Sequence, residues 1–114
     1  MIDLYNDDCL KVLPTLKEKS IDLIVTSPPY DNLRNYNKLS AWNFDIFKSV
    51  ANELQRVLKI GGVIVWVVND ATIKGSETGT SFRQALYFNE IGLNLHDTMI
   101  CLLYTSDAAD EVSC

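Results

Sequence analysis

The sequence has few of the residues that build metal sites: one histidine and three cysteines among 114 residues. The cysteines show no Cys-x-x-Cys or Cys/His spacing, which argues against a zinc site and leaves reduced thiols as the expectation. No apolar run reaches the length that crosses a membrane, and Asp3 stands where a signal peptide has its basic region. These absences predict a cytoplasmic protein without a metal.

Basic residues are also scarce, since 10 Lys and Arg against 15 Asp and Glu give a formal net charge of −5. Duplex DNA is held mainly by cations that neutralise its phosphates, so this chain alone does not look like a DNA-gripping surface. Its length suffices for one small domain, and a hydrophobic content of 47% is ordinary for a globular protein.

Two of the three prolines are adjacent, in the segment Thr26-Ser27-Pro28-Pro29-Tyr30, which follows the apolar run of residues 21–25. An apolar, β-branched run that stops at two prolines indicates a buried strand whose chain leaves the sheet abruptly. Ligands of open α/β sheets bind at this end of the strands. Ordinary strand exits and polyproline ligands have similar segments, but the position favours a site.

The chemistry that suits this segment is methylation of an exocyclic amine on a nucleobase. The lone pair of such an amine is delocalised into the ring, so the nitrogen becomes nucleophilic only when acceptors hold its N–H bonds in a more tetrahedral geometry. The Ser27 hydroxyl and the Pro28 carbonyl are suitable acceptors, and Tyr30 offers a stacking surface for a base extruded from its duplex.

The hydrophobic pattern predicts alternating strands and helices. We expect strands over residues 1–5, 21–26, 63–68 and 93–100, helices over 8–17, 43–58 and 80–91, and a loop over 69–78. We expect Gly61 and Gly62 to end the second helix, and Phe82, Leu86 and Phe88 to share a face of the third. This order predicts one α/β domain with a mostly parallel sheet.

Residues 1–100 resemble the amino-terminal half of a β-class site-specific DNA amino-methyltransferase. The matching segments, in the family's order, are Asn6-Asp7-Asp8-Cys9, Ser27-Pro28-Pro29-Tyr30, Arg56-Val57-Leu58-Lys59-Ile60-Gly61-Gly62 and Asn94-Leu95-His96-Asp97-Thr98-Met99-Ile100. The resemblance implies a partial, Rossmann-like methyltransferase domain that uses S-adenosylmethionine to methylate cytosine N4 or adenine N6 in double-stranded DNA with a flipped base. It also implies a link to restriction-modification or to phage or host DNA modification.

Residues 101–114 instead resemble a translated sequencing-library adapter, so we expect a methyltransferase half over residues 1–100 and a non-native tail over 101–114. The family's Phe-x-Gly-x-Gly turn, which cradles the cofactor, has no counterpart in the sequence. The main cofactor-binding motif is therefore expected to be absent, and the truncated chain to be inactive alone.

The resemblance implies catalytic roles for Ser27, Pro28, Pro29 and Tyr30. It implies cofactor contacts for Asp8 and Thr26, although an aspartate that caps a helix explains Asp8 equally well. Arg34 and Lys38, in the polar stretch after Tyr30, are candidate DNA contacts; the alternative is a solvated surface loop.

A serine at position 27, where adenine enzymes often have an acid, favours cytosine N4 over adenine N6. Two other interpretations remain open: methylation of an RNA base or a protein glutamine, and a non-enzymatic remnant. His96 is either a general base or a structural histidine, and Asp70 either lines the cleft or caps a loop. Trp42 and Trp66 are expected to be core or interface rings rather than stacking platforms.

Overall fold

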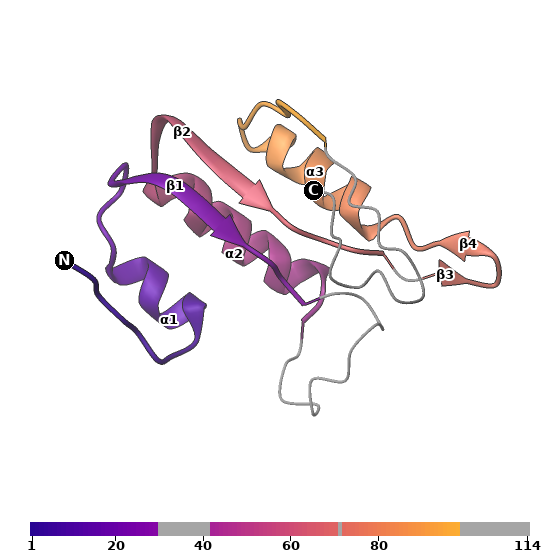
Figure 1. Ribbon diagram of the computed structural model, residues 1–114, viewed down its shortest axis with the longest axis horizontal. Helices are drawn as coiled ribbons and strands as arrows, with labels where there is room; N and C mark the ends of the chain where they lie inside the picture. Colours follow the sequence, from indigo (N-terminus) through magenta and orange to yellow (C-terminus); the bar gives the residue numbers. More distant parts are fainter. Residues whose placement is uncertain (30–41, 71, 99–114) are drawn as a thin grey trace, which may run out of the picture.

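The computed structural model describes residues 1–29, 42–70 and 72–98. The elements are α1 (Cys9–Val12), the 3₁₀ turn η1 (Leu13–Thr15), β1 (Ile21–Thr26), α2 (Phe44–Val57), β2 (Leu58–Trp66), β3 (Thr72–Ile73), β4 (Ser76–Glu77) and α3 (Thr80–Glu90). Figure 1 shows α2 running along the pair of strands β1 and β2, with α1 on the side of β1 and α3 on the side of β2.

Strands β1 and β2 form a parallel pair connected through α2, which confirms the predicted α/β class. Residues Ile24 and Thr26 pair with Ile64 and Trp66. The bounds of β1 are those expected from its apolar run, because the prolines that follow cannot continue the ladder.

The predicted role of the glycine pair is wrong. Helix α2 ends at Val57, and Leu58 is already extended, so Gly61 and Gly62 lie inside β2. They occupy an irregular stretch of the β1–β2 pairing. Gly61 has φ +85°, and a Cβ on Gly62 would come within 2.7 Å of the Leu58 side chain. The glycines therefore permit a bulge in the strand instead of stopping the helix.

Two further strands were predicted wrongly: residues 1–5 and 93–98 are not strands, and residues 99 and 100 lie outside the described residues. In the described part of the chain, β1 and β2 pair only with each other, so neither segment has a ladder to join. The predicted loop over 69–78 contains the hairpin β3–β4, which turns at Lys74 and Gly75 with φ of 52° and 79°.

Helix α1 is shorter than predicted, since the chain tightens into η1 at Pro14. The N-cap of α1 is Asp8, whose Oδ1 accepts a hydrogen bond from Leu10 N at 2.9 Å. Asn43 caps α2 in the same way, accepting from Ile46 N at 2.8 Å.

The core is centred on Phe47 of α2, which is fully buried. Its ring centroid lies between 5.3 and 6.5 Å from those of Trp42, Phe44, Trp66, Tyr87 and Phe88. The predicted face of α3 is confirmed for Phe88, which packs on Phe47, but is wrong for Phe82 and Leu86, which are exposed, whereas Gln84 is buried. Packing of Tyr87 and Phe88 against Phe47 turns Gln84 inward.

The face of the β1–β2 pair opposite α2 carries apolar side chains. Leu23, Val25 and Val63 are 58%, 65% and 54% exposed, and they alternate with Ile24 and Ile64, which are less exposed. Strands with apolar residues on both faces are typical of parallel sheets covered on both sides.

Candidate functional site

The candidate site lies where β1 ends and the chain turns into the two prolines. The strand end is held by its neighbour, since Val67 N donates to the Thr26 carbonyl at 3.0 Å. Ser27 is exposed, Pro28 is buried and Pro29 is half-buried. The two proline rings fix the backbone there, so the direction of the exit is set by covalent geometry.

A cavity of about 330 Å³ opens beside this strand end. Its lining residues come from α1, η1, β1 and its exit, α2, β2 and the residue before Asn43: Cys9, Leu13, Ile24, Thr26, Ser27, Pro28, Pro29, Trp42, Val50, Leu54 and Trp66. The structure thus brings Thr26, Ser27, Pro28 and Pro29 to one cavity. Tyr30, Arg34 and Lys38 lie outside the described residues.

The chemistry of the lining suits a flat heteroaromatic ring. None of the cavity-lining residues in the described part of the chain carries a charge, most are apolar, and two are tryptophans. Small-molecule sites have this character, with a few polar groups to fix orientation. The hydroxyls of Thr26 and Ser27 are such groups. A nucleobase ring fits this lining, whereas the charged amino-acid end of S-adenosylmethionine finds no charged partner in it.

Trp66 is a core ring, as expected from the sequence, but it also lines the cavity, and this second role was not predicted. Its ring packs against Phe47 and Phe88, and its Nε1 donates to Gln84 Oε1 at 2.9 Å. The signal was available in the strand pattern, because Trp66 stands at the carboxyl end of β2 and pairs in register with Thr26. Cys9 and Leu13 left no such signal.

Asp8 stands next to the cavity-lining Cys9, and its carboxylate caps α1. The capping interpretation of Asp8 is therefore confirmed, while its cofactor contact remains a prediction. Partial desolvation, and secondarily the Asp8 carboxylate, raise the pKa of the Cys9 thiol above its ordinary value, although the residue as a whole is exposed. Both effects disfavour the thiolate, so Cys9 is a weak nucleophile.

We expect iodoacetamide to alkylate Cys9 more slowly in the folded chain than in urea at pH about 8.5, because the raised pKa lowers the thiolate fraction. The difference should narrow as the pH rises through the pKa of the folded chain. Peptide mass spectrometry over time measures the rate at Cys9, with glutathione as the reference thiol in each solvent. Equal corrected rates in both solvents would contradict the assignment.

The other singled-out polar residues lie away from the cavity. His96 is exposed, and its Nδ1 lies 3.0 Å from Asp97 Oδ2. Asp70 accepts from Ser81 N at 2.8 Å and from Ser81 Oγ at 3.1 Å, and so holds the start of α3. The loop-capping interpretation of Asp70 is the one that the structure supports.

Two searches of the described residues returned nothing. Over residues 1–29, 42–70 and 72–98, no group of three or more His, Cys, Asp or Glu side chains is arranged to hold a metal ion. Among the helices of that part of the chain, none is long and apolar enough to span a membrane.

Comparison with known families gives the class of protein. The DNA methylase family, which contains the N6 and N4 methyltransferases, matches residues 21–102, and the chain belongs to it. The match includes β1, the Pro-Pro segment, α2, β2 and α3, so the cavity is built almost entirely from the matched region.

Among curated proteins, the chain is similar to orphan methyltransferase M.BamHII of Bacillus amyloliquefaciens, with 68% identity over 81 residues. It is also similar to type II methyltransferase M.BglII of Bacillus subtilis, with 34% identity over 100 residues. These alignments cover 71% and 79% of this chain but only 29% and 26% of the relatives. No solved structure matches significantly.

Proposed function

We propose that this chain is the part of a DNA amino-methyltransferase that activates the target amine, and that cytosine N4 is favoured over adenine N6. The observation that supports the proposal is the convergence of Ser27, Pro28 and Pro29 on one apolar cavity at the end of β1. The family match and the two methyltransferase relatives support a DNA base over an RNA base or a protein glutamine as substrate.

In the proposed mechanism the extruded base enters the cavity with its amine toward the strand end. Ser27 Oγ and the Pro28 carbonyl oxygen each accept a hydrogen bond from one N–H group of the amine. These two hydrogen bonds localise the lone pair on the nitrogen. S-adenosylmethionine would supply the methyl group when bound: the new N–C bond forms as the S–C bond breaks, S-adenosylhomocysteine leaves, and the methylated amine releases one proton to water. The two prolines restrict the backbone where the chain leaves β1, so both acceptors are already in place before the base arrives. The reaction therefore loses little conformational entropy in positioning them.

The remaining roles complete the proposal. Asp8 and Thr26 lie at or beside the cavity and are proposed cofactor contacts, while Tyr30 is the proposed stacking ring. Arg34 and Lys38 are proposed phosphate contacts. None of the described lining residues offers a charged partner for the amino-acid end of the cofactor, so we propose that other parts of a longer enzyme bind it and that residues 1–100 alone are inactive.

We also propose that residues 101–114 are a non-native tail, that the parent enzyme is cytoplasmic, and that it acts in restriction-modification or in phage or host DNA modification. The relative M.BglII, described as a type II methyltransferase, supports a link to restriction, whereas M.BamHII, described as an orphan methyltransferase, supports DNA modification without a restriction partner.

The test is nucleoside mass spectrometry of DNA from cells that express the complete enzyme recovered from the uninterrupted reading frame. We expect N4-methylcytosine above the level in cells with an empty vector. N6-methyladenine without N4-methylcytosine would overturn the choice of base, and absence of both would overturn the proposed activity.

A further inference from the structure

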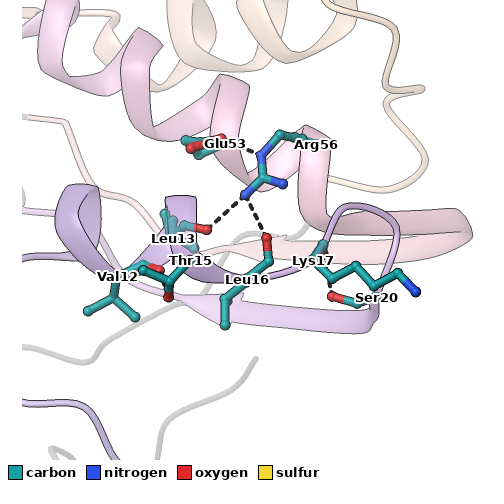
Figure 2. Close-up of polar contacts among 8 residues, drawn as sticks. All are labelled: Val12, Leu13, Thr15, Leu16, Lys17, Ser20, Glu53 and Arg56. Carbon is teal, nitrogen blue, oxygen red and sulfur yellow. Dashed lines mark hydrogen bonds and ion pairs between the residues drawn. The ribbon is translucent and has the colours of Figure 1, made fainter.

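Arg56, near the end of α2, connects this helix to the segment that precedes β1. Its Nη2 donates to the carbonyl oxygens of Leu13 and Leu16, at 2.8 and 2.9 Å, and its Nε donates to Glu53 Oε2 at 2.7 Å. Figure 2 shows the guanidinium between Glu53 and the two carbonyls of the turn. One side chain therefore holds both ends of η1.

The backbone at the same place makes a second connection. Lys19 N donates to the Arg56 carbonyl at 2.9 Å, and Ser20 N donates to the Val57 carbonyl at 2.8 Å. The chain from η1 to the start of β1 is thus bound to the end of α2 by side-chain and main-chain hydrogen bonds together.

These hydrogen bonds matter because burial does little to hold α1 and η1. No residue of either element is fully buried. Hydrophobic packing, which fixes the position of most helices, is weak here. In the described part of the chain, the half-buried guanidinium that donates to two carbonyls is accordingly a main contact that places this segment, since charge-assisted hydrogen bonds are stronger than neutral ones.

The placed segment contributes part of the cavity wall. Cys9 of α1 and Leu13 of η1 line the same cavity as Ser27, Pro28 and Pro29. Leu13 also supplies one of the carbonyls that Arg56 binds. A movement of η1 therefore changes the width of the cavity at the strand end.

We propose that Arg56 is a positioning residue for the methyl-transfer site: by fixing η1 it holds Cys9 and Leu13 where the cavity accepts a nucleobase ring. The inference rests on the proposed function. The ring belongs either to the target base or to the adenosine of the cofactor, which share the same planar aromatic chemistry.

The test compares Arg56→Lys with the unchanged complete enzyme. Lysine keeps the charge, but its shorter side chain ends in a single ammonium, which cannot hold both carbonyls and also keep the separate Nε contact to Glu53 that the guanidinium makes. We expect binding of the ring to weaken about tenfold, as expected for loss of a hydrogen bond from a charged group, with kcat unchanged. Calorimetric titration with S-adenosylhomocysteine measures whether binding of the cofactor's adenosine is weakened. The KM for duplex DNA measures whether binding of the target base is weakened. These two measurements are the cofactor arm and the base arm of the test.

Hydrogen exchange supplies a readout independent of activity. In Arg56→Lys the amides of residues 9–16 should exchange faster while those of α3 stay unchanged. The matched control is Arg83→Lys, because Arg83 is exposed, its Nη2 donates to Thr80 Oγ1 at 3.3 Å within α3, and it does not line the cavity. This control should change neither affinity nor exchange.

The outcomes separate positioning from a purely structural role. Weaker binding in either arm, with faster exchange confined to residues 9–16, supports the proposal, and the affected arm identifies the ring. Unchanged affinity in both arms overturns it, whether or not the thermal midpoint falls. If Arg56→Lys does not fold, Glu53→Gln removes only the ion pair of Arg56 and should weaken binding less; an unchanged affinity there also overturns the proposal.

Failure of the proposed function is recognised separately. It appears as an unchanged complete enzyme that methylates no DNA, whereas failure of the Arg56 proposal appears as a variant that binds as well as the unchanged enzyme. If the complete enzyme methylates no DNA, amide hydrogen exchange at residues 9–16 in Arg56→Lys still decides whether Arg56 fixes the cavity wall.

Discussion

Ser27→Ala in the complete enzyme is expected to lower the rate of methyl transfer by about 10²- to 10³-fold, the usual cost of removing one preorganised hydrogen-bonding group from a reaction centre. Ser27 lines the cavity at the end of β1, between the last strand residue and the buried Pro28. In the proposed mechanism, removing its hydroxyl leaves the amine with one acceptor and a delocalised lone pair. Single-turnover formation of methylated nucleosides, followed by mass spectrometry, measures the rate.

The Ser27 prediction has a matched control in Ser49→Ala. Ser49 is exposed on α2, and its Oγ donates to the Asp45 carbonyl at 3.3 Å, within the helix. This change also removes a serine hydroxyl and should leave the rate unchanged. Affinity for S-adenosylhomocysteine should be the same in both variants, because the proposed role of the Ser27 hydroxyl is to act on the amine. A Ser27→Ala enzyme as fast as the control would remove the basis of the proposed mechanism.

Phe47→Ala should lower the free energy of unfolding by about 3–5 kcal/mol, the range for truncating a buried aromatic ring. Phe47 is fully buried, and its ring contacts rings from α2, β2 and α3 and that of Trp42. The truncation therefore opens a cavity at the centre of the core. Urea unfolding followed by tryptophan fluorescence measures the change, because the Trp66 ring lies 5.7 Å away.

Phe82→Ala is the matched control for Phe47→Ala. Phe82 of α3 is 64% exposed, so its truncation should change the free energy of unfolding by less than about 1 kcal/mol. The comparison tests which face of α3 points inward, where the hydrophobic pattern and the structure disagree. Equal losses at the two positions would show that the aromatic core is assigned to the wrong residues.

The segments predicted correctly are those whose secondary structure is decided by residues close to one another in the sequence. Strand β1 is bounded by a proline pair that cannot continue a ladder, and α2 carries an apolar stripe at helical spacing after a capping asparagine. Asp8 also fulfilled its local role as a cap. In each case the deciding interaction joins residues a few positions apart.

The segments predicted wrongly depend on partners distant in the sequence. Gly61 and Gly62 look like a helix stop, but pairing with β1 draws Leu58 into the strand and leaves the glycines in a bulge. Residues 1–5 read as a strand, yet a strand forms only where a neighbour offers hydrogen bonds. The inward face of α3 was likewise set by Phe47 and not by its own pattern.

By itself the sequence determined the strand, the rigid proline exit with its serine, and the helix that connects two parallel strands, because covalent geometry and short-range hydrogen bonds suffice for these. Only the tertiary structure decided which side chains share the cavity. Arg56 and the Leu13 carbonyl are 43 residues apart, and Trp66 and Gln84 are 18 apart. Such contacts arise when packing brings distant elements together, and no periodicity along the chain records them.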